Sequence, residues 1–262
     1  MVCFGVQPSP GGYCAAMSSV TPKSAALESL ATQNDEQLGG AHSVLVRQKR
    51  DHVELDRLIA AIRAADGVHQ QALLNRLCRL VFPHAFAEES VLWPVIRRVL
   101  PDGDELTLRV EREHQEINEL FTELERTEPD EDHHRALFDR IAELLSEDVR
   151  DEEDVLLPRV QAALTRGHLI VLGAAWESVR RTAPTRPHPV VARRPPGNVI
   201  AALPLTVIDR LRDQLDRLSR STDSPLSAAA EGLSARMADA AGLLEHLPLL
   251  TRGEHRATHS AG

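Results

Sequence analysis

The chain has 262 residues, of which 42% are hydrophobic and 26% charged, as in an ordinary soluble globular protein. Only 3% are aromatic, which argues against a large β-sandwich or barrel core. The net charge of −9 argues against nucleic acid as a partner, and no apolar run is long enough for a membrane span. Three cysteines give no disulfide framework and no thiolate metal site, and they fit a reducing cytoplasm.

Charge and proline content divide the chain into five expected parts. Residues 41–165 carry 27 acids and 16 bases, whereas the remainder is slightly basic, and residues 182–197 hold five of the 16 prolines. A proline-rich stretch of this kind is typical of an extended linker. We therefore expect a disordered segment over 1–40, a bundle over 41–165, a basic Pro-rich linker over 166–202, amphipathic helices over 203–250 and a disordered tail over 251–262.

The acidic part predicts four helices, because its apolar residues recur at three- and four-residue steps. The expected spans are about 43–64, 70–99, from the break at 101–104 to 126, and 130–164, with Asp130 as the N-cap of the last. The short connections favour an all-α, up-down-up-down four-helix bundle. Pro94 and Pro158 lie inside the second and fourth patterns, where we expect kinks.

One or two further helices are expected after the linker. Residues 203–220 are amphipathic, with Val207, Leu211, Leu215 and Leu218 in one stripe, and a second helix is expected over 226–247. The stripe either packs back onto the bundle, which is the more common outcome, or contacts a protein partner or a second copy of the chain.

Every predicted bundle helix carries ionisable side chains in the middle of its apolar stripe. Burying one such group alone costs roughly several kcal/mol unless it is paired or coordinated. A single histidine in such a position is more often an ordinary core residue. Interruptions at matching heights in four successive helices favour a metal centre instead. They are His52 in the first helix, His84 and Glu88 in the second, His114 in the third, and Asp148 and Glu152 in the fourth.

The interruptions form an internal repeat. The motif His84-x-x-x-Glu88-Glu89 is followed by Pro94, and the motif Asp148-x-x-x-Glu152-Glu153 by Pro158, each proline ten residues after the start of its motif. The spacing places the first two members of each motif one turn apart on one helix face. Two helical hairpins of this design predict a pseudo-twofold site, and a two-metal centre bridged by Glu88 and Glu152 suits that symmetry.

Together these residues resemble the hemerythrin-like HHE cation-binding domain over about residues 43–165. The segment 180–205 resembles the Pro/Arg-rich extension carried by actinobacterial members. The resemblance implies a four-helix bundle with a non-haem di-iron site. Its terminal ligands would be His52, His84 and His114, and its bridging carboxylates Glu88 and Glu152.

Two positions depart from the family pattern. The family usually has histidine where this chain has Asp148, which either ligates iron as a harder, anionic donor or leaves one metal weakly held. Asn118 stands one turn after His114, where oxygen-carrying members have a further histidine, so both departures argue against a pure oxygen carrier. Around the ligands, Asp56 lies one turn from His52 and is expected to orient its imidazole, the alternative being a surface salt bridge.

The leading hypothesis is a cytoplasmic non-haem di-iron protein that binds or reacts with O2, peroxide or NO, in sensing, storage or detoxification. Whether it is an enzyme, with peroxide-consuming or oxidase-like activity, stays open at this point. The alternative is an iron-responsive regulatory or interaction module whose C-terminal helices contact a protein partner. A metal-free structural bundle ranks last, because the stripes offer no arginine near the buried carboxylates.

Overall fold

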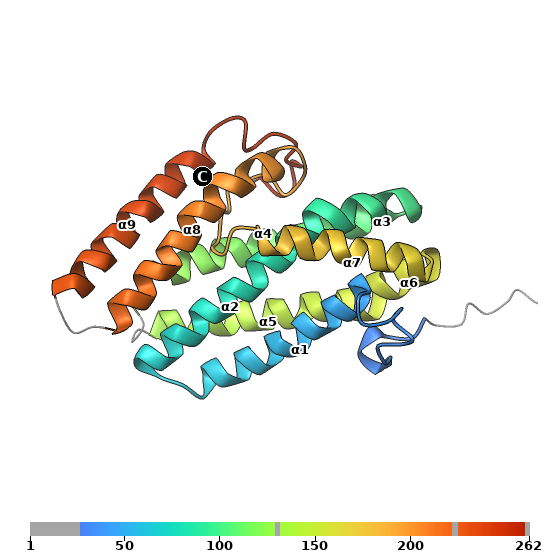
Figure 1. Ribbon diagram of the computed structural model, residues 1–262, viewed down its shortest axis with the longest axis horizontal. Helices are drawn as coiled ribbons and strands as arrows, with labels where there is room; N and C mark the ends of the chain where they lie inside the picture. Colours follow the sequence, from blue (N-terminus) through green and yellow to red (C-terminus); the bar gives the residue numbers. More distant parts are fainter. Residues whose placement is uncertain (1–26, 129–131, 222–224, 260–262) are drawn as a thin grey trace, which may run out of the picture.

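All four predicted bundle helices form in the computed structural model, which describes residues 27–128, 132–221 and 225–259 (Figure 1). These residues contain no strand, so the predicted all-α class is confirmed. The expected N-cap Asp130 lies outside the described residues. The first and third bundle helices are continuous: α1 spans Val44–Arg63 and α4 spans Gly103–Leu124.

The second and fourth bundle helices each contain one π-helical turn. In the second, α2 (Gly67–Ala87) continues through η2 (Glu88–Leu92) into α3 (Trp93–Val99). In the fourth, α5 (Asp132–Asp151) continues through η3 (Glu152–Leu156) into α6 (Leu157–Ala163). The irregularity predicted at Pro94 and Pro158 takes this form because a proline has no N–H to extend the α-helical ladder.

The core consists of two apolar clusters, one on each side of the ionisable layer. Along α1, for example, Val44, Leu45 and Val46 belong to one cluster and residues from Leu55 to Ile62 to the other, with His52 between them. The other bundle helices follow the same order. The ionisable side chains are therefore sealed above and below by packed apolar residues.

The N-terminal segment departs from the expected disorder over its described part. Residues 27–43 fold against the end of the bundle, with a short 3₁₀ turn η1 (Leu30–Thr32). Leu30 and Leu38 are fully buried in the core. The Lys49 ammonium donates to the carbonyls of Ala31 and Gln33, at 2.8 and 2.6 Å. Two isolated leucines gave no helical pattern, so the sequence did not indicate this packing.

Residues 166–202 also differ from the expected linker, since they begin with a helix, α7 (Arg166–Arg181). The hydroxyl of Thr165 caps it by accepting from the His168 N–H. Its buried face carries Leu169 and Trp176, and it packs on α1, α2 and η2 (Figure 1). Gly173 permits this packing, because a Cβ at that position would lie only 2.1 Å from the carbonyl oxygen of His42.

The proline-rich stretch after α7 leads into a helical hairpin, α8 (Gly197–Ser221) and α9 (Pro225–Glu245), beside the bundle (Figure 1). Leu205 faces a small core between the two helices, whereas Val207 and Leu211 are about half exposed. Residues 251–259, expected to be disordered, pack back on this stretch through the bond from Gly197 N–H to the Arg252 carbonyl. Within the described residues, no helix has both the length and the apolar character needed to cross a membrane.

Candidate metal centre

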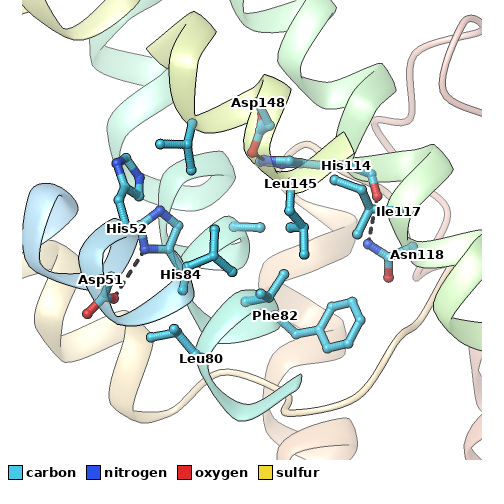
Figure 2. A pocket seen from close by; sticks show the side chains of 14 residues that line it. Asp51, His52, Leu80, Phe82, His84, His114, Ile117, Asn118, Leu145 and Asp148 are labelled. Carbon is cyan, nitrogen blue, oxygen red and sulfur yellow. Dashed lines mark hydrogen bonds and ion pairs between the residues drawn. The ribbon is translucent and has the colours of Figure 1, made fainter. Parts of the chain in front are cut away.

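The six predicted ligands meet in the middle of the bundle, and Figure 2 shows four of them. The Nε2 atom of His84 lies 3.0 Å from an oxygen of Glu88, and that of His52 lies 3.3 Å from an oxygen of Glu152. The Nε2 atom of His114 is 3.7 Å from Glu88 and 3.6 Å from Asp148. Five of the six residues are buried, and the side chain of His84 is only 12% exposed.

Two groups of three side chains have a spacing suited to a cation. One is formed by His52, His84 and Glu152, the other by Glu88, His114 and Glu152, and in each the donor atoms lie within 4.8 Å of one another. Because Glu152 belongs to both groups, the arrangement describes two neighbouring cation positions with a shared carboxylate.

Unpartnered polar atoms provide a test of whether a cation fits. Four buried atoms of the cluster have no hydrogen-bond partner: His52 Nε2, Glu88 Oε2, Asp148 Oδ1 and Glu152 Oε1. Buried polar atoms are rarely left unpaired, so a group of four at one place requires an explanation. Imidazole and carboxylate donors are those that iron accepts. The donor set and the orphaned atoms therefore fit a pair of metal ions.

The charges of the cluster lead to the same conclusion. Burial, followed by the nearby charges of Glu88 and Asp148, raises the pKa of Glu152 to about 8. Although burial opposes it, the carboxylates of Glu152 and Glu153 raise the pKa of His52 to about 9. Without a cation the surplus of buried acids thus draws protons onto the cluster. A bound cation would replace those protons.

The Nδ1 atom of each of the three histidines contacts a carboxylate. The Nδ1 atom of His52 lies 2.8 Å from Glu153, that of His84 lies 3.1 Å from Asp51, and that of His114 lies 3.0 Å from Glu89. Figure 2 shows the contact between Asp51 and His84. Such a contact fixes the ring orientation and directs Nε2 into the cluster, as metal-bound histidines usually require.

Glu89 and Glu153 belong to the repeated motif, but the sequence reasoning assigned no role to them. Both are buried, at 1% and 8% exposure, next to the equally buried Glu88 and Glu152. Adjacent residues of an α-helix point about 100° apart, and the π turns η2 and η3 begin at these pairs. The available signal was the second glutamate, which recurs at the same place in both halves of the repeat.

The two predicted outer residues occupy other roles. Asp56, which was expected to orient His52, is exposed on the surface of α1. Glu153 contacts the His52 imidazole instead. Asn118 is buried, and its side chain bonds to backbone groups of two histidines. Its amide donates to the carbonyl of His114 at 2.9 Å, a contact visible in Figure 2, and its oxygen accepts from the N–H of His188 at 3.0 Å.

The departure at position 148 makes the two halves chemically unequal. In the first half, Asp51 faces the imidazole of His84. In the second half, Glu113 faces Asp148, and burial together with the negative charge of Asp148 raises the pKa of Glu113 to about 7. The second half therefore places two carboxyl groups where the first has a carboxylate and an imidazole.

A small cavity of about 30 Å³ adjoins the cluster (Figure 2). Its walls are mostly apolar, and they include Phe82, Ile117 and Leu145 beside the polar Asn118 and Asp148. Two tryptophans close the site elsewhere: the ring of Trp93 stacks 6.5 Å from that of His114, and Trp176 meets His84 edge-on at 5.4 Å. Phe86 lines a different cavity.

Comparison with known proteins gives two matches. Residues 44–160 match the family model of the hemerythrin HHE cation-binding domain. An uncharacterized hemerythrin-like protein of Schizosaccharomyces pombe is 24% identical over 135 residues, which cover 51% of this chain and 66% of that protein. The matched part thus spans just under two thirds of that relative. No solved structure matches.

Proposed function

Because residues 44–160 belong to the hemerythrin HHE cation-binding family, we propose that their buried cluster binds a non-haem iron pair. The observation that carries the proposal is the group of four buried atoms without a hydrogen-bond partner, His52 Nε2 and three carboxylate oxygens. The Nδ1 atoms of the three histidines already contact other carboxylates, so their Nε2 atoms face the cluster. In this assignment the terminal ligands are His52, His84 and His114, the bridges are Glu88 and Glu152, and Asp148 is the sixth ligand.

The small oxidants O2, peroxide and NO are the proposed ligands of this site. Iron supplies a coordination position and electron exchange when it is bound. The chain's own residues hold the histidine rings in place, exclude bulk water with Trp93 and Trp176, and limit what enters. A cavity of about 30 Å³ has room for only one or two molecules of water size. Sensing, storage or detoxification in the cytoplasm, with peroxide-consuming or oxidase-like turnover, is the role we propose.

Metal analysis tests the proposal directly. The purified protein, expressed with excess iron, should hold close to two irons per chain. Replacing Glu152 by Ala removes the carboxylate common to both cation groups and should abolish most of the bound iron. The matched control is Glu143→Ala, an acid of the same helix whose side chain is 61% exposed. A wild-type protein without iron, or equal iron in both variants, contradicts the assignment.

The role of Asp148 is tested by Asp148→His. The new imidazole would face Glu113 as His84 faces Asp51, so we expect both irons to be held at least as tightly, with a changed near-ultraviolet absorption spectrum. Unchanged iron affinity together with an unchanged spectrum would exclude Asp148 as a ligand.

A second candidate function is an iron-responsive interaction module. It is favoured by the apolar face of α8, where Leu203, Val207 and Leu211 are 74%, 52% and 50% exposed. A protein partner or a second copy of the chain would cover this face. Sedimentation of the wild type beside a Val207→Ser, Leu211→Ser variant tests self-association, which is excluded if the wild type is a monomer across the micromolar range.

A further inference from the structure

The stretch between α7 and α8 is bound along the length of α4. We call residues 183–196 the C-terminal strap. Its contacts join Arg186 to Glu125, the His188 N–H to Asn118, Arg193 to Gln115, and Arg194 to Glu111 and Asp104. Five side chains of α4, from its first turn to its C-cap, therefore hold one continuous segment that leads directly into α8.

One strap residue reaches the outer side of the candidate metal centre. Arg193 is buried, and its Nη1 atom lies 3.8 Å from Oε2 of Glu89. The other oxygen of Glu89 is the one 3.0 Å from Nδ1 of His114. Arg193 is itself fixed by bonds to Gln115 at 3.1 Å and to the carbonyl of His188 at 3.2 Å. A contiguous chain of charged groups thus leads from the strap to one imidazole.

Of the carboxylates that hold the other two histidines, one also has a cation beside it: Asp51, which holds Nδ1 of His84, lies 3.5 Å from Nη1 of Arg180 at the end of α7. Glu153 holds Nδ1 of His52 as Glu89 holds that of His114, yet no arginine pairs with Glu153 in the described part of the chain. In a buried setting, a cation beside Glu89 weakens the pull of that carboxylate on the His114 N–H. His114 should therefore be a weaker electron donor to a bound metal than it would be without Arg193.

A second contact ties the strap to the same helical turn. The Asn118 side chain bonds the His114 carbonyl and the His188 N–H together. Movement of the strap would accordingly disturb both the side chain and the backbone of His114. If metal binding at His114 favours the docked strap, the docked strap must favour metal binding by the same factor.

We propose that Arg193 is a positioning residue for His114, acting through Glu89, and that metal occupancy is thereby coupled to docking of the strap and the α8–α9 hairpin. The inference rests on the proposed iron function. It assigns the C-terminal third of the chain a regulatory role toward the site, as a segment whose attachment responds to the state of the metal.

The test compares three variants of the full-length, iron-loaded protein: Arg193→Gln, Arg193→Lys and Arg194→Gln. Loss of a positive charge near the iron stabilises the ferric state, so Arg193→Gln should lower the midpoint potential. Arg193→Lys keeps the charge and should restore most of the potential. Arg194→Gln removes a charge from the same strap, but in the described residues Arg194 forms its ion pairs with Glu111 and Asp104, so this variant should leave the potential unchanged.

Hydrogen exchange gives a readout that does not depend on redox chemistry. Amides of α8 and α9 should exchange more slowly in iron-loaded wild type than in iron-free wild type, and Arg193→Gln should lose this difference. Equal exchange with and without iron in the wild type overturns the coupling even if a variant fails to fold. If Arg193→Gln keeps the wild-type potential, the inference is overturned but the proposed function is not. A wild type that binds no iron overturns both.

Discussion

Substitution of Gly173 by Ala should destabilise the protein because α7 is pressed against the start of α1. The added Cβ would lie 2.1 Å from the His42 carbonyl oxygen and 2.9 Å from the Val44 nitrogen. Ordinary contacts begin near 3.4 Å, so the two segments must separate by about 1.3 Å. Both obstructing atoms belong to the backbone, which cannot move aside as a flexible side chain does.

The magnitude follows from two opposing effects. Overpacking of a well-packed site costs about 1–3 kcal/mol, and backbone obstruction places Gly173→Ala at the upper end. The better helix propensity of alanine returns about 1 kcal/mol. A net loss of about 2 kcal/mol should lower the melting temperature by about 4–8 °C. Because α7 carries Trp176 to the His84 ring, iron content should fall as well.

The assay is thermal unfolding followed by circular dichroism, with Gly232→Ala as the matched control. Gly232 lies inside α9, and a Cβ there would meet nothing within 4 Å. That variant should gain about 0.5–1 kcal/mol from propensity alone. If Gly173→Ala were as stable as wild type, or if both variants shifted in the same direction, the close packing of α7 on α1 would be refuted.

Three further predictions concern the site and the strap. Glu153→Ala should weaken iron binding about 10–100-fold by freeing the His52 ring, as measured by competition with a chelator, whereas Asp154→Ala, an exposed neighbour, should not. Although burial opposes it, the two carboxylates beside His188 raise its pKa to about 9. Protonated His188 therefore stabilises the fold by about 3 kcal/mol at most, fully below pH 6.5, and this contribution is lost as pH rises through 9. Urea unfolding of His188→Gln should not show this loss. Arg186→Ala removes a buried guanidinium that pairs with the buried Asp213 and with Glu125, and it should cost about 3–5 kcal/mol, against less than about 1 for the exposed Arg140→Ala; equal losses in urea unfolding would contradict this reasoning.

The bundle was predictable because its signals are local and periodic. Apolar residues at three- and four-residue steps gave the four helices within a few residues of α1, α2–α3, α4 and α5–α6. The six inward ionisable residues were visible for the same reason, since each one interrupts a stripe whose direction is already known. Their convergence followed from the repeat, which places the two halves in register.

The residues that surround the ligands were not predictable in this way. α-Helical spacing predicts Asp56 as the partner of His52, but the residue that contacts its Nδ1 atom is Glu153, 101 positions away in the sequence. That contact depends on how α1 packs against η3, which no local pattern encodes. Glu89 and Glu153 also do not follow α-helical periodicity, because each lies in a π turn in which two consecutive glutamates are buried.

After residue 165 the proline content predicts a linker, whereas the structure begins there with a helix, α7. The prolines of this stretch begin at Pro184, after the end of α7 at Arg181. Arg186, Arg193 and Arg194 made the stretch resemble a solvated basic linker. The structure pairs each of them with acids of the bundle or of α8, so the excess of acid in one part and of base in the other is complementary.

The placement of the two tryptophans has a practical consequence for spectroscopy. The chain contains only Trp93 and Trp176, and their rings lie against His114 and His84, one in each half of the site. All indole emission therefore originates within a few ångströms of the proposed iron positions. A Trp93→Phe variant would leave a single fluorophore beside His84, and Trp176→Phe a single one beside His114. Quenching during iron titration would then report the filling order of the two positions without any attached label.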